Sequence, residues 1–247
     1  MKKITFSKAV FPNFATALNV FSGFVSIIYA SDHNYKMAAI FIFVAAFFDL
    51  LDGIIARILR TSSRLGVELD SLADVVSFGA APSFLIYKTH FISMGWPGIL
   101  LSSMIIVFGT FRLARFNVQL EEISTKLDFK GLPIPVPAVF LASLVLFFYN
   151  GLNIIEPLNR AMIPIIIILA LLMVSNIKYN TLPKVKYLTA GGKSVLILVS
   201  FGALLAVVLT QGEAFFYLVS AHIIFGVARY IYYLIFTEKK TSNVKLY

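Results

Sequence analysis

Long apolar runs, separated by short polar stretches, form the dominant pattern along the 247-residue chain. Several runs reach the roughly 17 to 25 residues that a helix needs to cross a membrane. The pattern predicts eight spans, at about residues 11–30, 37–58, 69–87, 97–116, 134–149, 161–175, 195–210 and 215–236. The fifth, sixth and seventh are short, since at about 1.5 Å per residue they fall below the roughly 30 Å of a hydrocarbon layer. We therefore expect an all-α protein, a polytopic membrane helical bundle.

Composition supports one membrane domain over a soluble core. The chain is 59% hydrophobic and 13% charged, and this charged fraction is about half that of a typical soluble domain. The chain has no cysteine, which excludes disulfides and thiolate metal sites. The apolar run after Lys2 and Lys3 also fits a signal peptide with cleavage near Ala30, but the many further spans favour a retained first helix.

The basic residues are distributed unevenly between the two sides of the predicted bundle. With an even number of spans, 18 of the 21 Lys and Arg residues fall on the side that carries both termini. The opposite side receives only Lys36, Lys88 and Arg160. Because cytoplasmic loops collect positive charge, we expect both termini to be cytoplasmic, most simply in a prokaryotic cytoplasmic membrane. The net charge of +9 is then explained by membrane topology, and no nucleic-acid partner is expected.

Four of the six aspartates are clustered between positions 49 and 74, at Asp49, Asp52, Asp70 and Asp74. A carboxylate near a membrane helix costs several kcal/mol unless it is paired, solvated or bound to a metal. Charged helix ends at the interface would explain one such residue, but they explain four together poorly. The cluster is therefore the candidate functional centre.

Helical spacing places the two acidic pairs on facing surfaces. Asp49 and Asp52 are three residues apart, and Asp70 and Asp74 are four apart, so each pair shares a helix face. Divalent cations would relieve the repulsion among four carboxylates, and oxygen ligands favour Mg²⁺ or Mn²⁺. Beside this centre, small residues and Arg57 suit a diphosphate, which predicts phosphoryl transfer. One carboxylate could instead accept a proton from an attacking hydroxyl.

The spacing Asp-x2-Asp-Gly-x2-Ala-Arg-x8-Gly-x3-Asp-x3-Asp, from Asp49 to Asp74, resembles the signature of the CDP-alcohol phosphotransferases at all eight fixed positions. The resemblance implies a two-metal centre held by the four aspartates, with Asp74 as the base toward the acceptor hydroxyl. It also implies a CDP-binding surface that involves Asp52 and the motif positions Gly53, Ala56, Arg57 and Gly66. Family members have a six-helix core and are usually dimers. We therefore expect a homodimer, a core over residues 1–176 and a two-helix membrane extension over 177–247.

Three further segments, 12–19, 111–117 and 131–137, resemble the integral-membrane phosphatidylserine synthases of that family. This resemblance implies CDP-diacylglycerol as donor, L-serine as acceptor and contact with membrane lipid. The same motif would serve glycerol 3-phosphate, inositol phosphate or choline as acceptor, or an archaeal ether lipid as donor. The prolines of 131–137 most simply shape the entry to a helix.

Polar residues in two of these segments have both functional and structural interpretations. Asn13, Thr16 and Asn19 share a helix face that could meet the nucleotide or bond a neighbouring helix. Arg112 and Arg115 could bind the serine carboxylate or anchor the helix in the cytoplasm. Asn117 could bind the acceptor, although helix capping is our preferred interpretation.

Two alternatives of another kind also place acids in a membrane. In a cation transporter, intramembrane aspartates bind the transported ion. Arg57 and the small motif residues argue against this, because a cation path gains nothing from an adjacent arginine. A purely structural scaffold would leave the clustered acids unexplained.

Overall fold

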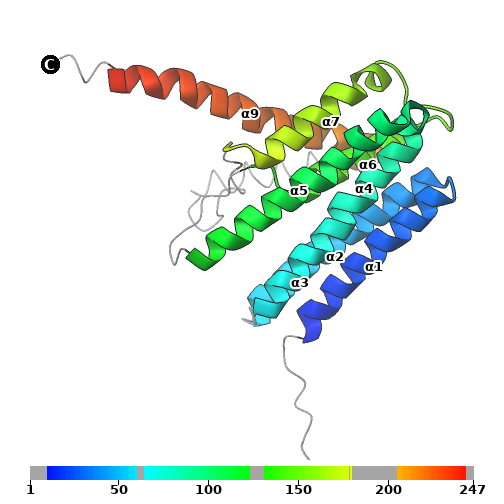
Figure 1. Ribbon diagram of the computed structural model, residues 1–247, viewed down its shortest axis with the longest axis horizontal. Coiled ribbons are helices and arrows are strands. Elements are labelled where there is room, and N and C mark those ends of the chain that lie inside the picture. The colour runs from blue at the N-terminus through cyan, green and yellow to red at the C-terminus, as the bar shows by residue number, and fades with distance from the viewer. Residues whose placement is uncertain (1–9, 60–63, 123–130, 178, 180–204, 243–247) are drawn as a thin grey trace, which may run out of the picture.

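A computed structural model describes residues 10–59, 64–122, 131–177, 179 and 205–242, which form helices, connecting turns and one isolated β-bridge between Tyr149 and Ile154 (Figure 1). The first helices are α1 (Val10–Ser31) and α2 (Tyr35–Leu59). A continuous rod follows, made of α3 (Arg64–Asp74), η1 (Val75–Ala80), α4 (Ala81–Ile86), η2 (Tyr87–Phe91) and η3 (Ile92–Met94). The later helices are α5 (Trp96–Glu122), α6 (Pro135–Phe148), α7 (Leu158–Val174) and α9 (Glu213–Ser242).

The helices confirm the predicted polytopic helical bundle. Five of them are long and apolar enough to cross a membrane, the third being the whole rod Arg64–Met94 of 31 residues. The helices α6 and α7 have 14 and 17 residues, so the fifth and sixth spans are short as expected. Most of the seventh predicted span, 195–210, lies outside the described residues, and its part 205–209 is helical.

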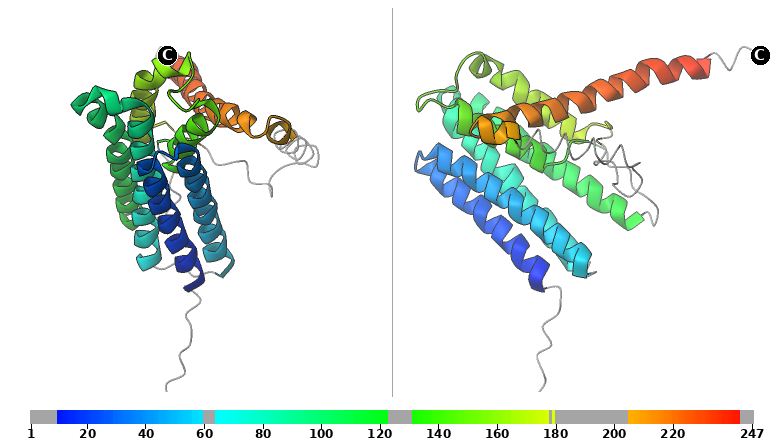
Figure 2. Two further views of the ribbon diagram at one scale, coloured as in Figure 1. Left: turned by 90° about the vertical axis from the view of Figure 1, so that its right-hand side faces the viewer. Right: turned by 180° about the vertical axis from the view of Figure 1, so that it is seen from behind.

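Small residues allow α1 and α2 to pack closely along their lengths. Ala30, Ala38, Ala39 and Ala45 are completely buried, and without long side chains the two backbones can approach each other. α2 also packs against α6, and α5 packs against α7. The chain alternates direction, so one end of the bundle gathers the start of α1, the end of α2, the start of α3 and the end of α5 (Figures 1 and 2).

The last helix, α9, packs against α6 through aromatic rings and then leaves the bundle. The ring of Phe216 lies 5.1 Å from that of Phe140 and 4.9 Å from that of Phe148. Beyond this contact the C-terminal part of α9 projects past the other helices (Figure 2). The division into a core over 1–176 and an extension over 177–247 stays a prediction.

The three basic residues predicted on the side opposite the termini lie at one end of the bundle. Lys36 is in the first turn of α2, Lys88 is in η2 and Arg160 is in the first turn of α7. Arg57 and Arg112 lie toward the other end: Arg57 is in the last turn of α2, and Arg112 is in the second half of α5, ten residues before its end. Among the described residues, these five basic groups are thus divided between the two ends of the bundle, and which end faces the cytoplasm stays a prediction.

Candidate active site

Three carboxylates meet between α2 and α3. Asp49, Asp70 and Asp74 each offer an oxygen atom, and these atoms all lie within 4.8 Å of one another. Asp74 is the most buried of the three, with 8% of its surface exposed. The structure therefore brings together the acids that helical spacing predicted to face each other.

The cluster lies inside the bundle rather than at the helix tips. Asp49 is ten residues before the end of α2 at Leu59, which is about 15 Å along the axis. Asp70 is six residues after the start of α3, or about 9 Å along its axis. Asp74 is buried at this depth and Asp49 and Asp70 are half-buried, so a bound charged group would feel them more strongly than it would at the surface.

Asp52 is bound separately by helix α1. Its Oδ2 accepts a hydrogen bond of 2.8 Å from the hydroxyl of Thr16, and both residues are buried. Asp52 interacts electrostatically with Asp49 and Asp70, but it lies outside the group of three whose oxygens share the 4.8 Å limit. The four predicted ligands thus form a close group of three with a tethered fourth beside it.

The donor atoms fit a hard divalent cation. Oδ1 of Asp70 and Oδ1 of Asp74 are buried, and neither has a hydrogen-bond partner among the described residues. Several carboxylates buried side by side require a compensating positive charge. All the candidate ligands are oxygen atoms, which matches Mg²⁺ or Mn²⁺ and disfavours zinc or copper.

The helix changes its winding directly after the acids. Asp74 ends α3, and the next six residues, Val75–Ala80, are π-helical. Such a segment has more residues per turn than an α-helix and is frequent at functional sites. The apolar pattern of the sequence did not predict it, because an isolated π-helical turn leaves the overall hydrophobic period almost unchanged.

The two arginines predicted to bind an acceptor have different surroundings. Arg112 is buried at 8% exposure and lies close enough to Asp74 to interact electrostatically. Its Nε has no hydrogen-bond partner within the described part of the chain. Arg115 instead donates from Nη1 to the carbonyl of Val174 at 2.9 Å and from Nη2 to that of Ser175 at 3.3 Å. Arg112 therefore faces the acids, while Arg115 caps the end of α7.

The preference for Asn117 as a helix cap is wrong. Helix α5 continues to Glu122, so Asn117 lies within the helix. Its Nδ2 donates to the hydroxyl of Ser71 at 3.0 Å, which joins α5 to α3 one residue after Asp70. The apolar pattern ended this helix too early, because its last turn is polar.

The polar face of α1 points into the bundle. Thr16 and Asn19 are buried, while Asn13 is half-buried. Thr16 bonds the neighbouring helix, which is the structural interpretation of this residue. The side-chain amide of Asn19 is buried, and neither its Oδ1 nor its Nδ2 has a partner in the described ranges. An amide with four unused bonding positions leaves a ligand-binding role open for Asn19.

The motif positions expected to receive CDP line one side of α2 and the first turn of α3. Gly53 and Ala56 are half-buried, as is Gly66. A Cβ atom on Gly53 would meet only the Nη2 of Arg57, at 3.8 Å. Arg57 is exposed, and its Nε donates to the carbonyl of Gly53 at 2.8 Å. The surface beside Gly53 is therefore open to a ligand, with a guanidinium at its edge.

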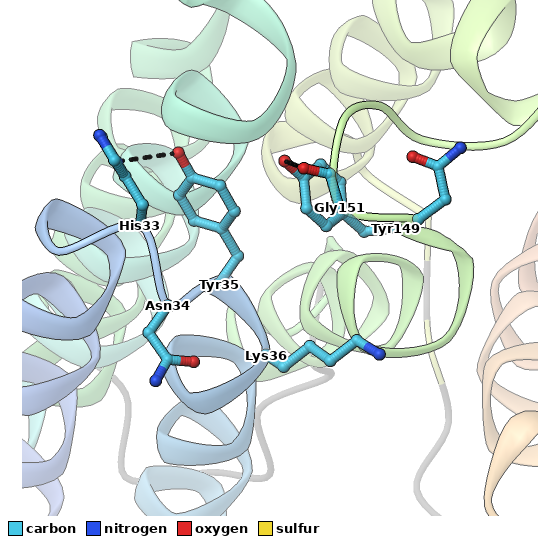
Figure 3. A pocket seen from close by; sticks show the side chains of 7 residues that line it. His33, Asn34, Tyr35, Lys36, Tyr149 and Gly151 are labelled. Atoms are coloured by element: carbon cyan, nitrogen blue, oxygen red, sulfur yellow. Dashed lines mark hydrogen bonds between the residues drawn. The ribbon is translucent and has the colours of Figure 1, made fainter.

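A separate cavity of about 490 Å³ lies at the opposite end of the bundle, between the turn that joins α1 to α2 and the residues after α6 (Figure 3). Its two tyrosine hydroxyls are engaged locally: that of Tyr35 lies 3.2 Å from Nδ1 of His33, and that of Tyr149 donates to the carbonyl of Gly151. These bonds shape the turns. The cavity is distant from the carboxylates and does not contribute to the candidate site.

Fold and site together define a polytopic helical membrane protein with a buried carboxylate centre suited to divalent cations. The family model for CDP-alcohol phosphatidyltransferase matches residues 9–174, and the chain belongs to this family. Membership in this family of transferases argues against the cation-transporter and scaffold alternatives.

Curated relatives resemble the chain over 56% to 94% of its length. It is 36% identical over 237 residues to the CDP-diacylglycerol–serine O-phosphatidyltransferase of Helicobacter pylori strain J99, which covers 94% of this chain and 97% of the relative. It is 38% identical over 183 residues to the archaetidylserine synthase of Methanothermobacter thermautotrophicus, covering 72% of each. A Bacillus subtilis CDP-diacylglycerol–serine O-phosphatidyltransferase is 38% identical over 139 residues, or 56% of this chain and 76% of the relative.

Proposed function

We propose that this protein transfers the phosphatidyl group of CDP-diacylglycerol to the hydroxyl of L-serine, which forms phosphatidylserine and releases CMP. The observation that carries the proposal is the close group of Asp49, Asp70 and Asp74 beside the buried Arg112. Such a site offers acids for a metal-bound diphosphate and a cation for an acceptor carboxylate. The relatives that match almost the whole chain carry the name of this reaction.

The donor would lie with its acyl chains in the bilayer and its headgroup against α2 and α1. Asp49, Asp52, Asp70 and Asp74 would hold Mg²⁺ or Mn²⁺, and bound cations neutralise the diphosphate and the leaving CMP. The open surface at Gly53 admits the phosphates, and Arg57 can pair with their oxygens. The remaining residues assigned to CDP are Asn13, Thr16, Asn19, Ala56 and Gly66.

Asp74 would take the proton of the serine hydroxyl. As the hydroxyl oxygen bonds to the phosphorus of the phosphatidyl group, the bond from that phosphorus to the CMP oxygen breaks. The proton passes to the carboxylate of Asp74, on an oxygen that does not bind a cation. A carboxylate within hydrogen-bond reach of the attacking group is the usual geometry for such a base.

The surroundings of the arginines favour serine over a phosphorylated acceptor. The carboxylate of serine needs one cation, for which the buried Arg112 is available beside Asp74. A phosphate group needs a denser set of positive donors. Arg115 uses Nη1 and Nη2 on the carbonyls at the end of α7, and this weakens the case for a two-arginine pocket. Asn117 stays a proposed acceptor contact, although it also bonds Ser71.

The charge separation supports a cytoplasmic active site. The acids lie toward the end of the bundle that carries Arg57 and Arg112, whereas Lys36 lies at the other end. Because the chain has no cysteine, single cysteines at Lys36 and Arg57 can be labelled selectively in intact and opened cells. Labelling of position 36 from outside, with position 57 reached only after opening, would support this topology. We also propose a homodimer, which mass measurement of the purified protein tests.

The central experiment identifies the lipid product. Purified protein in liposomes is given CDP-diacylglycerol, Mn²⁺ or Mg²⁺ and, separately, L-serine, glycerol 3-phosphate, inositol phosphate or choline. CMP release is measured and the lipid is identified by mass spectrometry. Phosphatidylserine formed only with serine supports the proposal, and a different lipid as the main product contradicts the acceptor.

Two further arms test the cofactor and the donor. Chelation with EDTA should abolish CMP release, and Mn²⁺ or Mg²⁺ should restore it, because the buried carboxylates need a cation. Full turnover after chelation would contradict a metal centre. A CDP-activated archaeal ether lipid, tested in parallel, shows whether the donor site selects the lipid backbone.

A further inference from the structure

Helix α1 contacts both acid-bearing segments through one face. Thr16, Asn19 and Gly23 are three and four residues apart, so they share this face. The Thr16 hydroxyl reaches Asp52 on α2 at 2.8 Å. The same face also meets η1, the segment that follows Asp74. Helix α1 therefore lies between the two elements whose relative placement determines the carboxylate cluster.

The contact with η1 is made by Ser77, three residues after Asp74. Its hydroxyl donates to the backbone carbonyl of Asn19 at 2.9 Å, and Ser77 is completely buried. Some buried hydroxyls bond the preceding turn of their own helix, as Thr89 does with Leu85 and Ser102 with Gly98. The Ser77 bond joins two different elements, so it acts on their separation.

Gly23 allows the backbones to approach at this contact. A Cβ atom on Gly23 would lie 2.7 Å from Cα of Ser77 and 2.9 Å from its Cβ. These distances are below any normal contact, and Oγ of Ser77 would lie closer still, so both the backbone and the side chain of Ser77 would have to move. Any larger residue at position 23 would force α1 and η1 apart.

The π-helical winding of η1 makes such an anchor necessary. A π-helical turn has more residues per turn than an α-helix, so it rotates the residues after it relative to those before it. Asp70 and Asp74 lie immediately before this turn. Without a fixed point beyond them, the rotation of their side chains toward Asp49 would be poorly determined.

We propose that Ser77 is a positioning residue: its bond to the carbonyl of Asn19, made possible by Gly23, holds Asp70 and Asp74 at the correct rotation toward Asp49. This inference deepens the proposed function, since it concerns the same carboxylate centre. Ser77 itself touches no substrate. Displacing a reacting group by about 1 Å is enough to lower rates about 100-fold, so a single anchoring bond can matter for turnover.

The test compares Ser77→Ala with Ser143→Ala. Ser143 is equally buried, but its hydroxyl donates to the carbonyl of Phe140 within α6. Both variants lose one buried hydroxyl. We measure the melting temperature, kcat and KM for CMP release, and Mn²⁺ binding by electron paramagnetic resonance in the absence of substrates. The resonance signal reports the metal site directly, independently of any acceptor.

The expected result is a defect in the site that exceeds any loss of stability. Ser77→Ala should weaken Mn²⁺ binding about tenfold and lower kcat about 10- to 100-fold, which is the usual range for a residue that orients metal ligands. Its melting temperature should fall no further than that of Ser143→Ala, which should keep normal binding and turnover. Gly23→Ala, which keeps the hydroxyl but separates the elements, should show the same defect as Ser77→Ala.

Two outcomes would overturn the inference: Mn²⁺ affinity and kcat in Ser77→Ala equal to those of the wild type, or a defect matched by Ser143→Ala. A failure of the proposed function is distinguishable. If the wild-type protein makes another lipid, the acceptor assignment fails, while the Mn²⁺ titration still decides the role of Ser77. If the wild type binds no Mn²⁺, the proposed metal centre is wrong. The comparison of kcat values between Ser77→Ala and Ser143→Ala then decides the role of Ser77.

Discussion

The hydroxyl of Thr16 on α1 donates a 2.8 Å hydrogen bond to Oδ2 of Asp52 on α2. The same hydroxyl oxygen lies 3.1 Å from the carbonyl oxygen of Pro12 in the preceding turn. The hydroxyl of Thr16 is therefore held from two sides. A bond to a charged group is stronger than one between neutral groups. This pair therefore fixes which oxygen of Asp52 faces α1.

Replacing Thr16 by valine should impair the site without disturbing packing. Valine keeps the shape of the side chain but cannot donate, so Asp52 loses its orienting bond. We expect kcat/KM for CMP release to fall about tenfold. Thr16→Ser keeps the hydroxyl and should retain most of the activity. Equal activity of the valine and serine variants would show that the bond has no role in turnover.

Asp74→Asn should nearly abolish turnover while CDP-diacylglycerol binding is largely kept. The amide cannot accept the serine proton, but three other carboxylates remain near the donor. Turnover should fall at least about 100-fold, as expected for loss of a general base. The rate of CMP release and the equilibrium affinity for CDP-diacylglycerol are both measured in this variant. Wild-type rates in this variant would remove Asp74 as the base.

Arg112→Lys should raise KM for serine and change little else in donor binding. Lysine keeps the charge but loses the planar pair of donors that matches a carboxylate. We expect KM for L-serine to rise at least about tenfold, since a bidentate contact is lost. KM for CDP-diacylglycerol should stay near the wild-type value. A rise in both constants, or in neither, would place the serine carboxylate elsewhere.

Arg115→Met should reduce stability more than it changes substrate affinity. The variant leaves the carbonyls of Val174 and Ser175 without the donors seen in the structure. The free energy of unfolding should fall by about 1 to 3 kcal/mol, which is the usual cost when hydrogen bonds from a charged donor are removed. Thermal unfolding in detergent measures this loss. A normal melting temperature combined with a large rise in KM for serine would instead place Arg115 in the acceptor pocket.

Asn117→Ala and Ser71→Ala separate the two roles proposed for Asn117. Both variants break the bond between α5 and α3, so a purely structural role predicts similar small losses of about 1 kcal/mol in stability and unchanged KM for serine. If Asn117 also binds the acceptor, as we propose, only Asn117→Ala should raise KM for serine. Kinetics of both variants at varied serine concentration distinguish these cases, and a normal KM in Asn117→Ala would exclude the contact.

Several features could be predicted from the sequence because they depend on local spacing or on solvent. The apolar runs predicted the helices, since a chain in a bilayer must satisfy its backbone bonds within each span. The spacings of Asp49 to Asp52 and of Asp70 to Asp74 predicted shared helix faces, because the helical period is constant. The distribution of Lys36, Lys88 and Arg160 predicted which helix ends lie together.

Only the tertiary structure decided which partner each polar side chain takes. Thr16 bonds Asp52, Ser77 bonds the Asn19 carbonyl and Arg115 caps α7, all across large distances in sequence. Sequence spacing does not contain this information, because it depends on the rotation and separation of neighbouring helices. Residue type and the helical period determined that a carboxylate group would form. Its arrangement, with three close acids and a fourth bonded to Thr16, depended on how α1 packs between α2 and the π-helical turn.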